Sequence, residues 1–257
     1  MNPIPVLGTA LINEPYWVYR LFYSIDYPVD DFVIWNNNGR GQITEELDHI
    51  KHLPHRFVKR VHVCHLPHNL GCSGAWNLTI KSFMMAPYWA ITNHDVMYEP
   101  GFLEAVAEKM EDPDLGMCHG NNGGWDFFAI KDWMIEKYGL FDEALVPAYV
   151  EDLEYGSRFM HTEDNDKRCL GVEPGYYHGA LKDSYDDGSQ SWRSEPELAQ
   201  KIHLSHEMNK QYVTQKWGPG WQAHVDEPTY PTPFNERLPQ TFTTYPLHFV
   251  RQKNLGF

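Results

Sequence analysis

The residues that follow the run Tyr88–Thr92 are the first in the chain that could do chemistry. The run is apolar and is followed by Asn93, His94 and Asp95, then by a Pro-Gly turn. Apolar runs bounded by turn signals are typical of strands in an α/β sheet, and such sheets bind ligands where their strands end. Asp95 is therefore a candidate metal ligand, although an Asp after a strand often serves only as a cap or turn residue.

Two further stretches could complete a site with Asp95. Glu151, Asp152 and Glu154 place three carboxylates at the start of a predicted helix, and His178 follows a later strand pattern. Each stretch also has a purely structural interpretation. Acidic residues stabilise a helix N-terminus through its dipole, and a loop histidine is often held only by hydrogen bonds. Their occurrence together with Asp95 favours a catalytic interpretation.

The elements that would position these residues alternate between strand and helix patterns. The predicted strands are Pro5–Ile12, Asp31–Trp35, Phe57–Val63 and Tyr88–Thr92, and the helices between them are Pro15–Ser24, Ile43–Leu53 and Ser73–Met85. This alternation implies right-handed crossovers and a largely parallel sheet with helices on both faces. Polar residues recur where the strands end, at Asn13, Asn36–Asn38, Asn69 and Asn93, so we expect them to meet at one edge of the sheet.

The second half of the chain continues the α/β pattern and then changes character. Strands are predicted at Leu115–His119, Trp125–Ile130 and Cys169–Val172, and helices from Gly101 to Met110, at Asp132–Tyr138, at Glu151–His161 and at Glu195–Lys216. From about Asp183 the sequence is rich in Pro, Trp, Tyr and Asp. We expect residues 1–182 to form a catalytic core, with residues 183–257 as an acceptor-side helix and extended tail in the same globular unit.

Composition excludes several classes of protein. A net charge of −14 disfavours a nucleic-acid partner, because such binding depends mainly on Lys and Arg. The four cysteines form no CxxC pair, which indicates reduced thiols rather than a disulfide scaffold. There is no signal peptide pattern and no apolar run long enough to span a membrane. We therefore expect a soluble cytoplasmic protein.

The ordered set of motifs resembles the family 2 inverting glycosyltransferases of the GT-A fold, over about Ile4 to Trp217. The matching stretches are Val33–Gly39, Asn69–Asn77, Asn93–Val96 with Pro100-Gly101, Tyr138–Glu143, Glu151–Glu154, His178 and Asn209–Gly218. The resemblance implies a Rossmann-like mixed sheet with helices on both faces and a C-terminal extension. It also implies sugar transfer, with inversion, from a nucleotide-diphosphate donor to a glycan or other hydroxyl acceptor.

The resemblance assigns roles to individual residues. Asp95 and His178 would hold Mn²⁺ or Mg²⁺ against the donor diphosphate, and imidazole suits Mn²⁺ better. Asp152 would be the general base, kept ionised by the helix dipole, with Glu151 and Glu154 orienting it or contacting sugar and acceptor. The residues expected to bind the nucleotide sugar are Thr9, Asn13, Asn36, Asn38, Asn69, Gly71, Asn77 and Asn93. Trp125 and Asp126 could line the donor-sugar pocket, although Trp125 could equally be a core residue.

The sequence departs from the family pattern in two places. Asn93 and His94 stand where the family more often has carboxylates, so the protein would supply less charge to the cation. Asn36, Asn37 and Asn38 replace an Asp-containing motif that usually reads the base. Amides can still pair with uracil, so a UDP-sugar is the favoured donor.

Two other functions remain open at this point. A sugar-1-phosphate nucleotidyltransferase has a similar sheet, but it would normally carry a Gly-rich loop with Arg and Lys near the first strand, which Leu7–Ile12 lacks. A catalytically silent protein that binds carbohydrate or nucleotide sugar would account for the nine Trp and fifteen Tyr residues. Such a protein would have no need of a base at Asp152.

Overall fold

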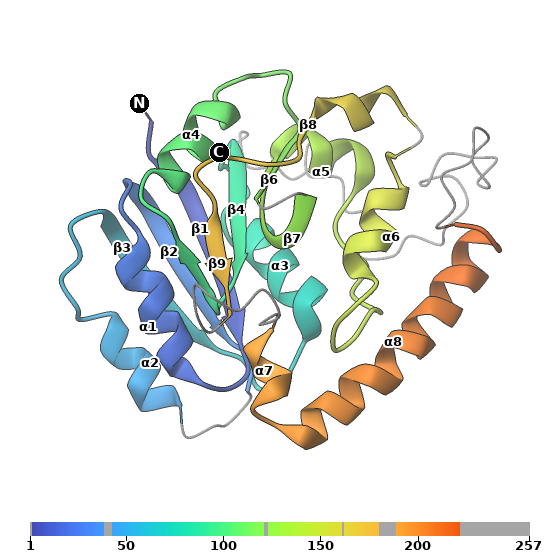
Figure 1. Cartoon of the computed structure of the whole chain (residues 1–257), viewed down its shortest axis with the longest axis horizontal. Helices are drawn as coiled ribbons and strands as arrows, with labels where there is room; N and C mark the ends of the chain where they lie inside the picture. The colour runs from blue at the N-terminus through green and yellow to red at the C-terminus, as the bar shows by residue number, and fades with distance from the viewer. Residues whose placement is uncertain (1, 39–42, 121–122, 161, 180–188, 222–257) are drawn as a thin grey trace, which may run out of the picture.

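The computed structural model describes residues 2–38, 43–120, 123–160, 162–179 and 189–221. Within these residues seven strands form a central sheet in the order β3-β2-β1-β4-β7-β6-β8 (Figure 1). Their bounds are β1 Ile4–Leu11, β2 Val29–Asn36, β3 Val58–His65, β4 Tyr88–Asn93, β6 Met117–Gly120, β7 Gly124–Lys131 and β8 Arg168–Cys169. The fold is therefore α/β with a mixed sheet.

The sheet is parallel over its first four strands and again between β6 and β8. β3, β2, β1 and β4 run parallel, as the alternating pattern predicts, whereas β7 is antiparallel to both β4 and β6. β7 makes the sheet mixed, as the resemblance implies; only three residues separate β6 from β7, too few for a crossover helix. The carboxyl ends of β1 and β4 still meet at one edge, since Ala10 pairs with Asn93.

Helices cover both faces of the sheet. The helices α1 Pro15–Ser24, α2 Thr44–Ile50 and α4 Phe102–Met110 pack on one face, and α3 Gly71–Ser82, α5 Asp132–Tyr138 and α6 Glu151–Ser157 pack on the other. Fully buried aromatic rings fill each side, including Phe22 and Phe102 on the first and Phe141 and Tyr155 on the second. Burial of such rings gives the layers most of their stability.

Two elements are shorter than the sequence predicts. The helix predicted at Glu151–His161 ends at Ser157, where turns lead to the 3₁₀ helix Glu163–Lys167; the Thr162 side chain caps that helix by accepting the Asp164 N–H. The strand predicted at Cys169–Val172 is reduced to Arg168–Cys169, because β8 pairs with only two residues of β6.

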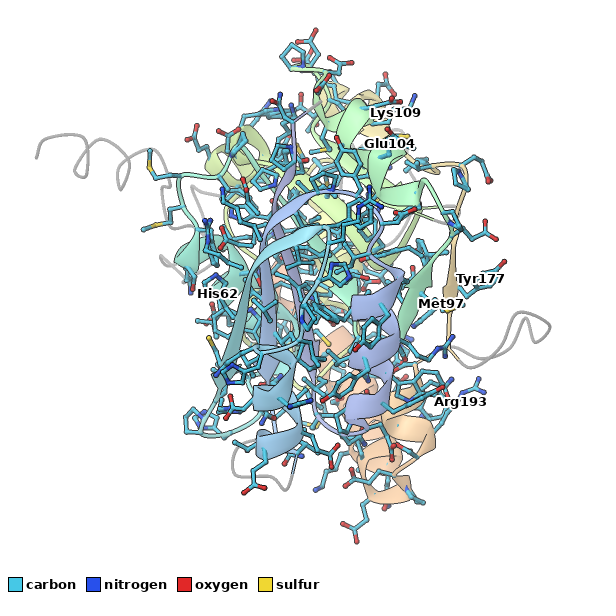
Figure 2. The ribbon with its side chains drawn as sticks, turned by 90° about the vertical axis from the view of Figure 1, so that its left-hand side faces the viewer. His62, Met97, Glu104, Lys109, Tyr177 and Arg193 are labelled. Carbon is cyan, nitrogen blue, oxygen red and sulfur yellow. The ribbon has the colours of Figure 1, made fainter. Side chains whose placement is uncertain are left out.

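A second, two-stranded sheet was not predicted. It joins β5 Val96–Tyr98 to β9 Tyr176–His178 in antiparallel register, with Met97 opposite Tyr177. Figure 2 shows these two side chains next to each other on the outside of the molecule. The register places His178 opposite Val96, so a histidine far along the chain comes to lie beside Asp95.

The described C-terminal part consists of α7 Gln190–Arg193 and the long helix α8 Pro196–Trp217. α8 lies along the outer side of the molecule (Figure 1, orange), one residue away at each end from its predicted bounds. Its Val213 packs with Leu145, Val150 and Trp221 in a small buried cluster. Residues 222–257 lie outside the described residues, so the assignment of 183–257 to the acceptor side stays a prediction.

All four cysteines are free in the structure, and Cys118 is buried. No helix among the described residues has both the length and the apolar character that a membrane span requires.

Candidate active site

A cavity of about 450 Å³ opens at the carboxyl ends of β1 and β4. Residues Ala10–Ile12 line it from the end of β1, and Thr92–His94 line it from the end of β4. Glu151 and Asp152, at the start of α6, line it from the other side, and His178 lines it from β9. Residues of all three stretches singled out in the sequence therefore face one shared space, although Asp95 itself does not line it.

His178 sits between two carboxylates at the polar side of the cavity. Its Nε2 lies 3.3 Å from Asp95 Oδ1, and its Nδ1 lies 3.4 Å from Asp126 Oδ2. The other oxygen of Asp95 accepts a hydrogen bond of 2.6 Å from the Gln190 N–H of α7. Asp95 is 1% exposed, and its Oδ1 has no well-aligned hydrogen-bond donor. The β5–β9 pairing thus brings Asp95 and His178 together, as the metal prediction requires.

The charges of these groups act on one another. Burial pushes the pKa of Asp95 upward, but the imidazoles of His94 and His178 and the Gln190 N–H lower the pKa to about 2. Burial lowers the pKa of His178, whereas Asp95 and Asp126 raise it, and the net effect is a raised pKa. Asp95 is therefore ionised at neutral pH and places a negative charge behind the cavity wall, next to His178.

The geometry of Asp95 and His178 suits two ligands of one divalent cation. Neighbouring ligand atoms of an octahedral ion with bonds of about 2.1 Å lie roughly 3 Å apart, close to the 3.3 Å between Asp95 Oδ1 and His178 Nε2. In the part of the chain that the structure describes, no group of three or more His, Cys, Asp or Glu side chains could hold a metal ion. The donor set fits a cation only if substrate oxygens complete its coordination.

The backbone before α6 has an unusual conformation. Tyr149 and Val150 have φ angles of 73° and 80°, the left-handed region that non-glycine residues rarely adopt. Each such residue costs about 1–3 kcal/mol, so the surrounding structure must hold it in place. Asn209 of α8 does so by donating hydrogen bonds to the carbonyls of Ala148 (3.3 Å) and Tyr149 (3.0 Å). This turn is what directs the first residues of α6 into the cavity.

The two carboxylates that follow this turn have different environments. Glu151 is 5% exposed, its Oε2 has no hydrogen-bond partner, and burial together with the charge of Asp152 raises the pKa of Glu151 to about 8. Burial also raises the pKa of Asp152, although its Oδ1 accepts a 2.8 Å hydrogen bond from the Leu153 N–H. The effect of burial on the pKa of Asp152 thus outweighs that of the helix dipole, which the sequence interpretation expected to keep Asp152 ionised. A carboxylate with a raised pKa is a stronger proton acceptor.

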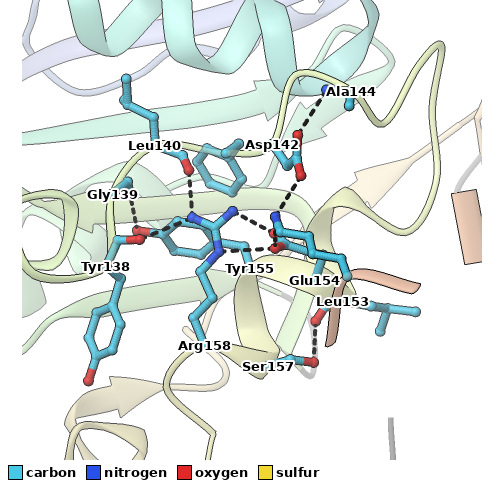
Figure 3. A network of polar contacts seen from close by, with 12 residues as sticks. Tyr138, Gly139, Leu140, Asp142, Ala144, Leu153, Glu154, Tyr155, Ser157 and Arg158 are labelled. Atoms are coloured by element: carbon cyan, nitrogen blue, oxygen red, sulfur yellow. Dashed lines mark hydrogen bonds and ion pairs between the residues drawn. The ribbon is translucent and has the colours of Figure 1, made fainter. Parts of the chain in front are cut away.

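Glu154 does not line the cavity. It is fully buried and accepts hydrogen bonds from Arg158 at 2.6 Å and from Lys216 at 2.7 Å (Figure 3). The Trp217 indole N–H of α8 donates a third, at 3.0 Å. Glu154 therefore ties α6 to α8, rather than contacting sugar or acceptor as the sequence interpretation allowed.

Five of the residues expected to bind the nucleotide sugar line the cavity, namely Asn69, Gly71, Asn93, Trp125 and Asp126. Gly71 has a φ of 75°, and a Cβ there would lie 2.9 Å from the Pro147 carbonyl oxygen. A glycine is therefore needed for α3 to approach the loop before α6 so closely. Trp125 is partly exposed and makes edge contacts with Phe128 and Phe141, so it belongs to the cavity wall and to the core at once.

The other five expected contacts do not line the cavity. Asn77 is buried and holds the backbone of Phe141 through hydrogen bonds at 2.9 and 3.0 Å. Asn36 bonds to His65, and Asn38 bonds to the Ile12 carbonyl. Thr9 is buried within β1, and Asn13 donates to the Ser191 carbonyl of α7. In this structure their side chains organise the strand ends and α3, and their predicted contact with the nucleotide is untested.

Several residues of the cavity wall were given no role from the sequence. They are Asn37, Cys72, Trp76 and His94, together with Tyr149, Ser191 and Trp192. Asn37 and His94 lie inside motifs that were recognised in the sequence. Their position in those motifs was the signal that could have indicated a place in the cavity wall. Nothing in the local sequence indicates that Ser191 and Trp192 return to the strand ends, because their place depends on the long-range bonds of α7 to Asn13 and Asp95.

The raised pKa of Glu151 predicts a pH-dependent stability difference. Between about pH 4.5 and pH 8 the unfolded chain has released the Glu151 proton while the folded protein retains it, so this group makes the protein less stable as the pH rises. Glu151→Gln cannot ionise, and we expect its melting temperature minus that of the wild type to be larger at pH 8 than at pH 5. Thermal melts of both proteins at the two pH values test this; an unchanged difference would contradict the raised pKa.

The sequence model of the family "Glycosyl transferase family 2" matches residues 13–168, whereas a search of curated protein sequences found no match. The mannosyltransferase PcManGT from Pyrobaculum calidifontis, solved with GDP-Man and Mn²⁺, has a TM-score of 0.56 and 11% identity, covering 100% of this chain and 80% of that one.

Two structures of TarS from S. aureus are also similar. TarS 1-349 with UDP has a TM-score of 0.52 and 12% identity, and with UDP-GlcNAc a TM-score of 0.51 and 11% identity. Each alignment covers 82% of this chain and 70% of TarS 1-349. These likenesses show that the mixed sheet with helices on both faces is a GT-A fold. With a family match over more than half of its length, the chain belongs to glycosyl transferase family 2.

Proposed function

We propose that the protein transfers a sugar, with inversion, from a nucleotide-diphosphate donor to a hydroxyl acceptor. The observation that carries this proposal is the shared cavity, because Asn93, Asp126 and His178 line it together with Glu151 and Asp152. A donor diphosphate at the first group would leave its sugar facing the second. Family membership supports transfer over the nucleotidyltransferase alternative, and the carboxylates favour catalysis over binding alone.

The ligands of the structural neighbours support a nucleotide-sugar donor. PcManGT was solved with GDP-Man and Mn²⁺, and TarS with UDP or UDP-GlcNAc. We favour a UDP-sugar because the amides at the strand end Asn36–Asn38 can pair with uracil, and Asn37 lines the cavity there. Asn69 lies at the same end.

Asp152 is the proposed general base. In a single displacement the acceptor oxygen attacks the anomeric carbon from the side opposite the nucleotide, and Asp152 takes the hydroxyl proton as the new bond forms. Glu151 is largely protonated at neutral pH, since its pKa is about 8. It therefore leaves Asp152 as the anionic member of the pair, and its own O–H can donate a hydrogen bond within the cavity.

Asp95 and His178 are the proposed protein ligands of a divalent cation, with Mn²⁺ favoured because an imidazole takes part. When bound, the cation would supply positive charge to the diphosphate and so stabilise the departing nucleotide. His94 and Asn93 are uncharged partners at this strand end, since burial lowers the pKa of His94. The negative charge on the protein side of the cation thus comes mainly from Asp95.

A panel of nucleotide sugars tests the proposed function. The full chain should hydrolyse at least one of UDP-glucose, UDP-galactose, UDP-GlcNAc, GDP-mannose and their relatives slowly in Mn²⁺, and the same donor should raise its melting temperature. Asp152→Asn in the same assay separates true turnover from a contaminating hydrolase. Absence of both hydrolysis and stabilisation across the panel would count against a nucleotide-sugar transferase.

Replacement of Asp95 tests the metal assignment. Asp95→Asn keeps the acceptor for the Gln190 N–H but removes the charge, so we expect nucleotide affinity in Mn²⁺ to fall by about tenfold or more. Calorimetric titration of nucleotide with Mn²⁺, and again with EDTA, measures this. The wild type should lose affinity for the nucleotide in EDTA, whereas the affinity of the variant should change little. Equal metal dependence in both proteins would show that Asp95 is not a ligand.

A further inference from the structure

The cavity wall next to Asp152 is apolar. It is formed by the loop Pro147–Tyr149, by Trp192 of α7, and by Leu198 and Ile202 of α8. Leu198 and Ile202 are four residues apart, so they lie on the same face of α8. We call the side chains of Tyr149, Trp192, Leu198 and Ile202 the apolar wall.

The apolar wall is fixed to the loop that carries the base. Further along the same face of α8, Ser205 and Asn209 donate hydrogen bonds to the Ala148 carbonyl, at 3.5 and 3.3 Å. The ring of His206 makes an edge contact with Tyr149 at 5.6 Å. The wall therefore keeps its place relative to Asp152, which lies only three residues beyond Tyr149.

The cavity also has a polar part. Asn93, Asp126 and His178 line it at the end of β4 and at β9, and this is the side assigned to the donor diphosphate. In a transfer reaction with Asp152 as the base, the acceptor hydroxyl must lie at Asp152 while the rest of the acceptor lies away from the donor. The apolar wall lines the same cavity as Asp152 and is joined to it along the chain through Tyr149.

We propose that the apolar wall binds the non-reacting part of the acceptor, and that the acceptor is an uncharged hydroxyl compound carrying an alkyl or aryl group. This inference rests on the proposed function. An unsubstituted sugar placed against the wall would lose hydrogen bonds to water and find few new ones among these side chains. An alkyl group gains roughly fourfold in affinity for each methylene that it buries.

Charge favours a neutral acceptor over an anionic one. The wall begins beside Glu151 and Asp152, and the whole chain has a net charge of −14. A phosphate or carboxylate on the acceptor would be repelled by the Asp152 anion at short range, where screening by salt is weakest. The acceptor class is thus an alkyl or aryl glycoside or a comparable neutral amphiphile.

The test uses methyl, hexyl and octyl β-glucoside below their micelle concentrations. Dissociation constants for the full chain are measured by calorimetry, and donor hydrolysis is measured separately with the nucleotide-sugar panel. We expect octyl β-glucoside to bind at least about tenfold more tightly than the methyl glucoside. Ile202→Asn should remove most of that difference. Met85→Asn, at a side chain that is 62% exposed and outside the cavity, should preserve it.

Each outcome separates the acceptor inference from the proposed function. Equal binding of the three glucosides, no binding of any, or a chain-length effect that Ile202→Asn leaves intact would overturn the apolar wall as the acceptor site. Trp192→Ala replaces Ile202→Asn if the latter does not melt cooperatively. Donor hydrolysis without a chain-length effect would leave the proposed function standing and refute only this inference. Chain-length dependence without turnover of any donor would refute the acceptor role.

Discussion

We expect Asp152→Asn to lower the rate of sugar transfer by about 10²- to 10⁴-fold, because the amide keeps the shape of the carboxylate but cannot take the acceptor proton. This loss corresponds to roughly 3–5 kcal/mol of activation free energy. The amide oxygen of the variant can still accept the Leu153 N–H, which Asp152 accepts at 2.8 Å, so the start of α6 should be preserved. Initial transfer rates and donor dissociation constants of both proteins, measured with the donor found in the panel, test this expectation.

Glu151→Gln is the matched control. Glu151 is largely protonated at neutral pH, since its pKa is about 8, so a neutral amide changes its charge little. We expect a much smaller rate loss than in Asp152→Asn. A normal rate in Asp152→Asn together with a large loss in Glu151→Gln would transfer the role of base to Glu151. A parallel loss of rate and donor affinity in Asp152→Asn would instead make Asp152 a donor contact. Glu154 is not an alternative base, because its carboxylate already accepts hydrogen bonds from Arg158, Lys216 and Trp217.

The sheet and most helices could be predicted because their signals are local. Apolar runs bounded by turns mark β1 to β4, and the helix pattern of Pro15–Ser24 starts with a Pro at its first position and matches α1 to the residue. Likewise, the place of Asp95 at a strand end follows from one buried run, Tyr88–Asn93. These features depend on residues that are neighbours in the sequence, so a single sequence reports them.

The assembly of the site could be predicted only in part, because it depends on distant segments. The β5–β9 pairing that sets His178 beside Asp95 joins residues about 80 positions apart, and neither three-residue strand has a pattern of its own. The strained Tyr149-Val150 turn is held by Asn209 of α8, so its conformation is not a property of the local sequence. The candidate residues of the site were predicted from the resemblance to the family. The contacts between these residues could be seen only in the structure.

The polar contacts between α6 and α8 are the other place where distant residues decide the structure. The Lys216 side chain is 3% exposed, and its Nζ lies 2.6 Å from Asp142 Oδ2 and 2.7 Å from Glu154 Oε1. Asp142 also accepts from the Tyr212 hydroxyl at 2.9 Å. One cation thus joins two buried carboxylates, and α8 brings it to the helix that begins with Glu151 and Asp152.

We expect Lys216→Met to destabilise the protein by about 3–5 kcal/mol, because it leaves two buried carboxylates with one cationic partner fewer. For a chain of this size that corresponds to a fall in melting temperature of roughly 6–20 °C. Lys81→Met is the control. Its Nζ lies 2.6 Å from Glu143 Oε1, but both side chains are about one third exposed, and the loss should stay below about 1 kcal/mol. Similar losses of stability in the two variants would contradict the explanation that the larger loss comes from the burial of the Lys216 ion pairs.

The pH dependence of Lys216→Met distinguishes a lost ion pair from lost packing. Burial raises the pKa of Asp142, but Lys216 and other donors lower it below the usual value. A carboxylate with a lowered pKa stabilises the folded state above its unfolded pKa of about 3.9, and that stability is lost as the pH falls through the folded pKa. Without Lys216, Asp142 should protonate at higher pH in the folded protein. The difference in melting temperature between the wild type and Lys216→Met should therefore narrow from pH 7 toward pH 4. A difference that stays constant with pH would mean that Lys216 acts through its methylene chain and not through its charge.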